Sequence, residues 1–167
     1  MKDINRIYDE CVEILENAGI AVTAPRPTLK VNTRATKRWG QSRINHGTGY
    51  REINIAKVML DDNADEYPVH NTMLHEMLHQ ECPGDNHGGE WKRKADKVTR
   101  LTTYNITRCT SYDEYGVHLP TREKPAKYIC RCKECGLEIK RERMSRFVEH
   151  PENFKHGTCT AGFERIK

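Results

Sequence analysis

The spacing of apolar positions along this chain predicts helices and strands in a definite order. Between residues 3 and 17, apolar side chains recur at helical spacing, with Asp3 suited to cap the helix and Gly19 to end it. Three short segments that follow have the composition and turn signals of strands: residues 28–33, 38–45 and 50–56. Three short strands after a helix, with further helices beyond, favour an α+β fold.

A central helix is predicted to begin at Pro68 and to run to about Cys82, before the Pro83-Gly84 break. Five apolar residues fill one broad arc of this helix: Val69, Met73, Leu74, Met77 and Leu78. That arc would pack on a core, so the other side of the helix would face a cleft. Residues 90–101 are predicted to form the next helix, and residues 110–125 a linker, because Gly116, Pro120 and Pro125 interrupt them.

The cleft side of the central helix carries the sequence His75-Glu76-Met77-Leu78-His79, an H-E-x-x-H pattern. Because positions i and i+4 lie on one face of a helix, His75 and His79 can hold one metal ion between them. Zinc suits imidazole nitrogens, and a catalytic zinc keeps three protein ligands and one open position for water. Glu76 lies next to that face and is the candidate general base that takes a proton from this water. The pattern therefore predicts a metal-dependent peptidase.

The third metal ligand has three candidates downstream of the motif. Glu81 is two residues beyond His79 and would point off the metal face, whereas Glu90 falls on the first turn of the next helix. His87 lies in a glycine-rich loop that can bend back towards the central helix. We therefore favour His87 as the third ligand.

Composition and charge indicate one ordinary domain with a small appendage. Of 167 residues, 36% are hydrophobic and 31% are charged, which predicts a modest core. No apolar run approaches membrane-spanning length and the N-terminus does not resemble a signal peptide, so we expect no membrane partner and a cytoplasmic location. Residues 1–119 hold 16 Lys and Arg against 17 Asp and Glu, whereas residues 120–167 hold 12 against 7. The basic excess of the last third could meet nucleic-acid phosphates or form a solvated surface.

The cysteines indicate a second metal site. Seven cysteines make an odd count, which argues against a simple disulfide framework. Cys132-x-x-Cys135-Gly136 has the shape of a zinc knuckle, and His156 with Cys159 would form the partner pair of a closed, structural zinc site. Residues 137–140, between the pairs, are a candidate strand. Cys130 competes for a place in the first pair, and we assign no role to the isolated Cys11, Cys82 and Cys109.

Together these motifs resemble the SprT-like zinc metalloprotease family, of the SprT and Spartan type. The similarity is carried by Thr72–His79, by His87-Gly88-Gly89-Glu90-Trp91-Lys92, and upstream by residues 29–32 and Arg38-Trp39-Gly40. The stretch from Tyr128 to Gly136, closed by His156 and Cys159 before Gly162-Phe163, resembles the C-terminal zinc ribbon of the family. The resemblance extends over nearly the whole chain from Asp3 onward.

The resemblance implies a small zincin-type α+β domain over residues 1–115, followed by a zinc ribbon over residues 120–167. The first domain would combine the N-terminal helix, the three-stranded sheet, the H-E-x-x-H helix and a further helix. The resemblance also implies that His75, His79 and His87 bind catalytic zinc, that Glu76 is the general base, and that the ribbon helps to bind DNA. The extra cysteine, Cys130, departs from the pattern and leaves the ligand pairing of the ribbon open.

We therefore expect a zinc-dependent endopeptidase with one catalytic and one structural zinc ion. Its substrates would be proteins or peptides, including proteins bound or crosslinked to DNA. DNA phosphates would meet the basic side chains of the last third: Arg131, Lys133, Lys140, Arg141, Arg143 and Arg146. The alternative is a nucleic-acid-binding zinc protein whose H-E-x-x-H site is vestigial or structural. Glu76 favours the enzyme, because a structural site has no use for a base.

Overall fold

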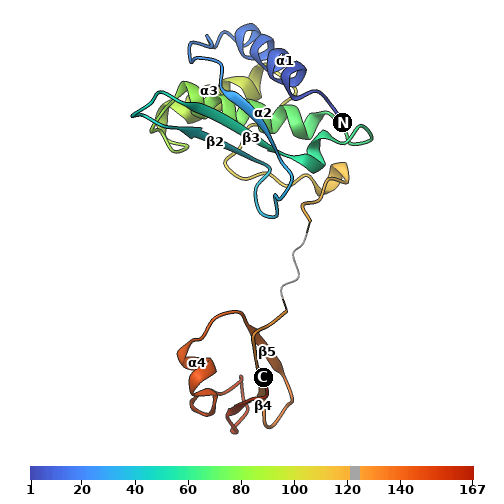
Figure 1. Ribbon diagram of the computed structural model, residues 1–167, viewed down its shortest axis with the longest axis vertical. Coiled ribbons are helices and arrows are strands. Elements are labelled where there is room, and N and C mark those ends of the chain that lie inside the picture. Colours follow the sequence, from blue (N-terminus) through green and yellow to red (C-terminus); the bar gives the residue numbers. More distant parts are fainter. Residues whose placement is uncertain (121–124) are drawn as a thin grey trace. The chain divides into compact units, whose positions relative to one another are not determined.

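The computed structural model describes residues 1–120 and 125–167 and divides into two compact units, Met1–Thr121 and Arg122–Lys167. Each unit has its own three-stranded sheet and its own buried apolar cluster (Figure 1). The described residues form four α-helices and two small sheets, which is an α+β fold. No helix among the described residues is both long and apolar enough to cross a membrane.

The first unit contains three helices and one sheet, and each lies close to where the hydrophobic pattern predicts it. The helices are α1 (Ile4–Asn17), α2 (Tyr67–Glu81) and α3 (Gly89–Leu101), and the strands are β1 (Thr28–Asn32), β2 (Gly40–Ile44) and β3 (Arg51–Ala56). The strand order is β1-β3-β2, with β1 parallel and β2 antiparallel to β3. Strand β2 is therefore an edge strand. The side chain of Asp3 caps α1 as predicted, and Gly19 follows its end with a φ of 66°.

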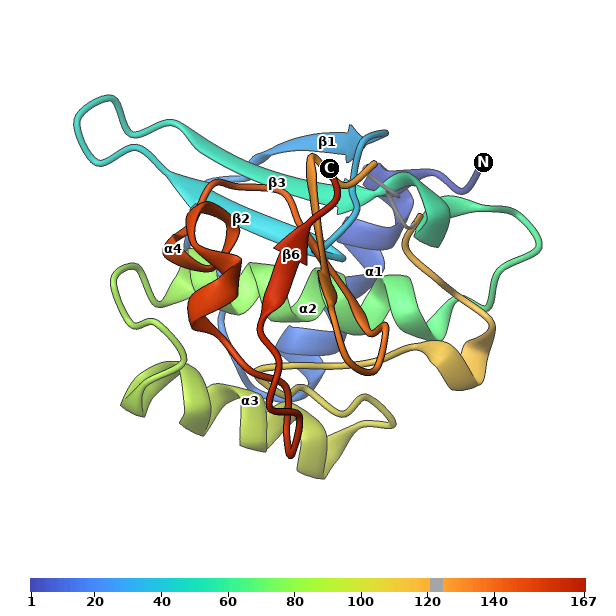
Figure 2. The same cartoon turned by 90° about the horizontal axis from the view of Figure 1, so that it is seen from below.

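Helix α2 lies at the centre of this unit. It contacts β2 and β3 on one side and α1 and α3 on others, and Figure 2 shows it between the sheet and α3. The predicted apolar arc is buried, and so are polar residues outside that arc. Among these, Gln80 donates a hydrogen bond of 2.6 Å to the Ser42 hydroxyl of β2. A helix buried on several sides holds the groups it carries in fixed positions.

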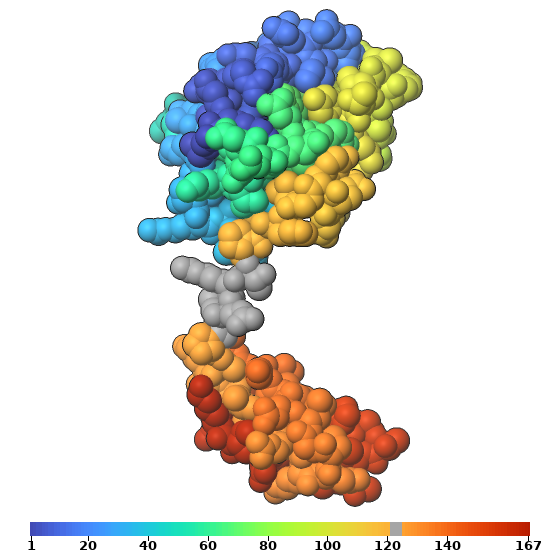
Figure 3. Space-filling model, turned by 90° about the vertical axis from the view of Figure 1, so that its right-hand side faces the viewer, coloured from blue at the N-terminus to red at the C-terminus, as the bar shows by residue number. Residues whose placement is uncertain are grey.

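The prediction of a linker over residues 110–125 is wrong for its first part. Tyr112 and Val117 are buried, and a short 3₁₀ helix, Asp113–Tyr115, lies between them. The Tyr112 hydroxyl accepts a hydrogen bond of 3.0 Å from the Asn71 amide of α2. In Figure 3 the orange surface just before residue 120 lies against the green surface of α2. Glycine and proline correctly indicate turns in this segment, but the burial of the Tyr112 side chain makes the segment part of the core rather than a linker. Residues 121–124 of the predicted linker lie outside the described residues.

The second unit is a small antiparallel sheet with one short helix. Its elements are β4 (Tyr128–Cys132), β5 (Glu138–Arg141), α4 (Arg146–Glu149), a 3₁₀ turn (Pro151–Asn153) and β6 (Phe163–Arg165). Strand β4 is central, in the order β5-β4-β6. The fully buried part of its core consists of Cys130, Cys132, Val148 and Phe163. So few buried apolar side chains rarely stabilise a unit of this size alone, and a metal or another crosslink usually supplies the rest.

Candidate active site

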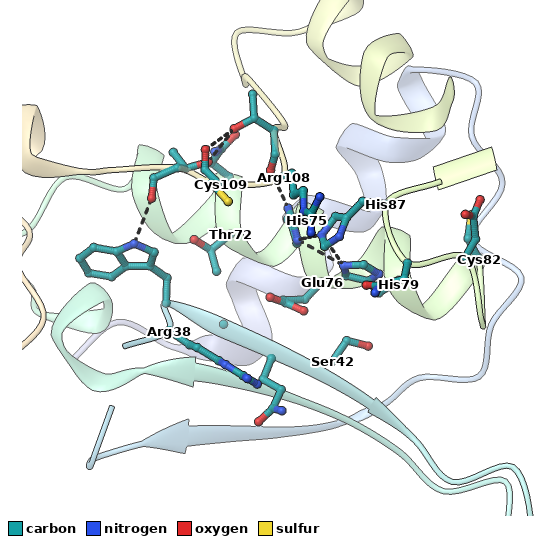
Figure 4. A pocket seen from close by; sticks show the side chains of 18 of the residues that line it. Arg38, Ser42, Thr72, His75, Glu76, His79, Cys82, His87, Arg108 and Cys109 are labelled. Carbon is teal, nitrogen blue, oxygen red and sulfur yellow. Dashed lines mark hydrogen bonds between the residues drawn. The ribbon is translucent and has the colours of Figure 1, made fainter. Parts of the chain in front are cut away.

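Three histidine rings converge at one point on the surface of α2. His75 and His79 project from successive turns of this helix, and His87 returns to them from the loop between α2 and α3 (Figure 4). Their Nε2 atoms lie 3.2 Å (His75 to His79), 3.1 Å (His79 to His87) and 3.0 Å (His75 to His87) apart. Tetrahedral zinc with bonds of about 2.0–2.1 Å places its nitrogen ligands about 3.3 Å apart. The triangle of nitrogens therefore fits zinc in both chemistry and size.

The protonation of these rings supports the same conclusion. Nδ1 of His75 lies 3.0 Å from the carbonyl oxygen of Thr107. A carbonyl only accepts hydrogen bonds, so Nδ1 carries the proton and Nε2 presents its lone pair to the other rings. Burial lowers the pKa of His75 and of His79 to about 4 each, so both rings are neutral at neutral pH. Where the lone pairs of two such nitrogens face each other at this distance, they repel unless a proton or a metal cation lies between them.

The position of the third ring depends on an unusual backbone conformation. His87 has a φ of 61° and is the one non-glycine residue in the left-handed region among residues 1–120 and 125–167. Such a conformation costs about 1–3 kcal/mol and persists only where the surroundings enforce it. Here the Asp85 carboxylate accepts hydrogen bonds from the backbone amides of Glu90 (2.7 Å) and Trp91 (2.9 Å). These bonds fix the loop to the start of α3 and turn the His87 ring towards α2.

The indole of Trp91 packs against all three histidine rings. Its centroid lies 4.9 Å from that of His75, 5.4 Å from that of His79 and 4.6 Å from that of His87. Trp91 is 2% exposed. One buried aromatic surface therefore restricts the orientation of every ring that faces the proposed ion. The sequence places Trp91 within a family motif, but its spacing alone assigns it no role.

Glu76 lies beside the histidines with its carboxylate against β2. The side chain is buried, and burial raises its pKa to about 7, although the backbone amide of Ser42 and the charge of Arg38 oppose that rise. A group with a pKa near 7 can both accept and donate a proton at neutral pH. At Gly40, an added Cβ would lie 2.7 Å from Glu76 Oε1, closer than real atoms approach. Glycine is thus required where β2 passes the carboxylate.

The histidines and Glu76 open onto a cleft of about 740 Å³. Its walls are β2 and the segment before it, α2, the loop to α3 and residues 107–110. The Trp39 indole donates a hydrogen bond of 3.2 Å to the carbonyl oxygen of Thr110 and so joins two of these walls. The same 107–110 segment supplies the carbonyl that orients His75. Sequence patterns give no signal for this carbonyl, because any residue type can supply one.

Residues 6–110 match the model of the SprT-like family. The chain belongs to the SprT-like family. A search of curated proteins finds no match. Membership suggests a metalloprotease-type function. The three histidines, Glu76 and every residue that lines the cleft except Tyr112 lie on the SprT-like part of the chain.

The other two candidates for the third ligand lie elsewhere in the SprT-like unit. Glu81 accepts hydrogen bonds from the backbone amides of Thr23 (3.0 Å) and Ala24 (2.9 Å) and so holds the segment after α1. Glu90 forms an ion pair of 3.1 Å with Lys94 on the next turn of α3. Of the three candidates, the structure brings only His87 to the other two rings.

The second unit, which follows the SprT-like match, groups three of the four predicted ribbon ligands. The sulfur atoms of Cys132, Cys135 and Cys159 lie within 4.8 Å of one another. Tetrahedral zinc with bonds of about 2.3 Å places sulfur ligands about 3.8 Å apart, so this cluster can hold zinc. His156 lies outside the group of three, but its Nδ1 is 3.4 Å from the Cys135 sulfur. Cys130 is fully buried in the apolar core and is not part of the cluster.

Proposed function

We propose that this protein is a zinc-dependent endopeptidase with a zincin-type site. One observation carries the proposal: three neutral histidine nitrogens form a triangle of zinc-ligand dimensions beside a buried carboxylate, at the wall of an open cleft. Three protein ligands leave a fourth position for water or substrate, as catalytic zinc requires. The carboxylate supports hydrolysis, because a purely structural site needs no proton acceptor.

Each residue of the site then has a definite task. Zinc held by His75, His79 and His87 would supply Lewis acidity and lower the pKa of a water molecule towards about 7. Glu76 accepts a proton from the attacking water and returns it to the leaving amine of the cleaved peptide bond. The Ser42 amide holds the Glu76 carboxylate on the β2 side, so the acceptor remains aimed into the cleft.

We further propose that the second unit is a zinc ribbon held by Cys132, Cys135, His156 and Cys159. Its zinc would be structural, because four protein ligands leave no open position. The basic excess of residues 120–167 supports contact with DNA phosphates. Proteins bound or crosslinked to DNA are therefore the proposed substrates of the cleft.

The decisive experiment compares the zinc-loaded protein with Glu76→Gln. The variant keeps the three histidines, so we expect it to hold zinc and to lose peptide cleavage by at least about 10³-fold. A DNA-binding protein, with and without single-stranded DNA, serves as substrate, and fragments are detected by mass spectrometry. Equal cleavage by the variant would show that Glu76 is not the base. If the wild-type protein binds DNA and both zinc ions but cleaves nothing, the chain is a nucleic-acid-binding zinc protein instead.

A further inference from the structure

Three basic side chains line the cleft without an ionic partner in the part of the chain that the structure describes. Lys37 and Arg38 precede β2, and Arg108 lies in the loop after α3. All three are exposed and form no ion pair or side-chain hydrogen bond among the described residues. Figure 4 shows Arg38 and Arg108 on opposite sides of the Glu76 carboxylate. Positive charge therefore flanks the proposed hydrolytic centre from two separate segments.

The charge on these side chains reaches the centre itself. Arg38 lies close enough to Glu76, and Arg108 to His87, for the charge of each cation to act on that group. The other carboxylate that lines the cleft, Asp85, is occupied by the amides that begin α3. Apart from the effect of Arg38 on Glu76, the cations of the cleft thus form no ion pair with a carboxylate among the described residues. An incoming ligand meets a positive field on both sides of the catalytic group.

Several other basic side chains of this unit have carboxylate partners, unlike the three that line the cleft. Arg6 pairs with Glu10 and Glu66, Arg26 with Asp9, and Lys92 with Asp96. The chain thus has carboxylates close to these cations, yet it places none against Lys37, Arg38 or Arg108. Unpaired cations in a cleft recognise anionic groups, and the planar guanidinium of arginine suits a carboxylate in particular.

We propose that the cleft selects polypeptides that carry acidic side chains on both sides of the scissile bond. This inference rests on the proposed peptidase function and deepens it: within a protein bound to DNA, the cleft would cut acidic segments rather than the basic segments that contact phosphates. Carboxylates within a few residues of the bond would pair with Arg38 on one side and Arg108 on the other. A lysine-rich or arginine-rich segment would meet like charge at both positions and would bind less well. A nucleic-acid strand in this cleft would exclude the peptide that the centre cleaves, so acidic protein is the ligand that fits.

The test uses the zinc-loaded full chain and peptides that differ only in charge. One peptide carries Asp and Glu on both sides of the cleaved bond, a second carries Asn and Gln at the same positions, and a third carries Lys. We expect kcat/KM for the acidic peptide to exceed that for the amide peptide roughly tenfold at low salt, with the Lys peptide slowest. Added salt should shrink this ratio, because the cations are exposed.

The variants separate this preference from a general loss of activity. In the double variant Arg38→Gln, Arg108→Gln, the acidic-to-amide ratio of kcat/KM should fall towards one. Arg34→Gln removes an exposed cation outside the cleft and should keep the wild-type ratio. Zinc content and thermal unfolding are measured for every variant. These readings exclude loss of metal or of fold as the cause of any change.

Three outcomes would overturn the inference. Equal cleavage of all peptides by the wild-type protein, or a ratio that survives in the double variant, refutes it while the peptidase function stands. If a single-stranded oligonucleotide blocks peptide cleavage by the wild-type protein but not by the double variant, the cations bind phosphates rather than acidic protein. Failure of the wild-type protein to cleave any peptide or protein would instead refute the function on which the inference rests.

Discussion

The close approach of β2 to Glu76 makes Gly40→Ala the sharpest test of the proposed geometry. The new Cβ would lie 2.7 Å from Glu76 Oε1, 2.7 Å from Thr72 Cγ2 and 2.8 Å from Glu76 Cγ. Carbon contacts are comfortable at about 3.5–4.0 Å, so either the strand or the carboxylate must move by about 0.7 Å or more. The helix is buried and cannot retreat easily, so we expect the Glu76 side chain to be displaced.

The size of the effect follows from this displacement. A misplacement of about 1 Å in a catalytic group costs up to roughly 100-fold in rate, so kcat should fall between about 10-fold and 100-fold. Overpacking costs about 1–3 kcal/mol in the free energy of unfolding, part of which alanine offsets by restricting the unfolded chain. Zinc content should not change, because Gly40 lies against Glu76 and Thr72 rather than against the three histidines.

The assay measures kcat and KM on one peptide, zinc by mass spectrometry, and the unfolding temperature by circular dichroism. Gly47→Ala is the matched control, because its new Cβ would meet nothing closer than Asn45 Oδ1 at 3.4 Å. The control should keep wild-type kcat. If Gly40→Ala also keeps wild-type kcat, or if it loses zinc along with activity, the carboxylate is not held by β2 in the way described.

Three further predictions concern stability and metal binding. The pKa of Glu52 is lowered from 4.5 to about 2 by Lys30 and by hydrogen bonds that Glu52 accepts from Tyr50 and Asn54. The ionised Glu52 therefore stabilises the fold above pH 4.5, and this contribution is lost as the pH falls towards 2. Denaturant unfolding of Glu52→Gln should show a deficit of about 1.5–3 kcal/mol at pH 7 that shrinks at pH 3; a deficit independent of pH would argue against the charge as its cause. Adding zinc to the metal-free protein should change the fluorescence of Trp91, because its indole contacts all three histidine rings. The variant Trp91→Phe should abolish this change, and the variant Trp39→Phe should preserve it. Cys135→Ser should release one of two zinc ions and unfold the second unit while the first retains its unfolding temperature; retention of both ions would remove Cys135 from the ligand set.

The sequence predicts those parts of the fold that depend on local patterns. Helix α2 and the shared face of His75 and His79 follow from a period of 3.6 residues, because residues one turn apart must share a face. Strands β1, β2 and β3 follow from their composition and from the turns between them. The burial of the segment around Tyr112 could not be predicted in this way. Its turn residues are local signals that indicate a linker, whereas its burial depends on contacts with Asn71 and Thr72 of α2, which are distant in the sequence.

The finer geometry of the site depends on contacts between residues far apart in the chain. The carbonyl that orients His75 belongs to Thr107, and the atoms that forbid a side chain at Gly40 belong to α2. No periodicity encodes such pairs. Likewise, the sequence allows Cys130 as a ribbon ligand. Burial does not distinguish it, because Cys132 is buried in the same core, and only the position of its sulfur keeps Cys130 out of the cluster.

The left-handed backbone of His87 has a consequence for metal exchange. Any part of its cost of about 1–3 kcal/mol that the Asp85 hydrogen bonds do not offset is taken from zinc binding, at roughly fivefold in the zinc dissociation constant per kcal/mol. His75 and His79 are fixed on a buried helix, whereas His87 can recover this energy by rotating its backbone away from them. The loop ligand would then detach first, and a chelator or a competing metal would enter from the loop side of the cleft.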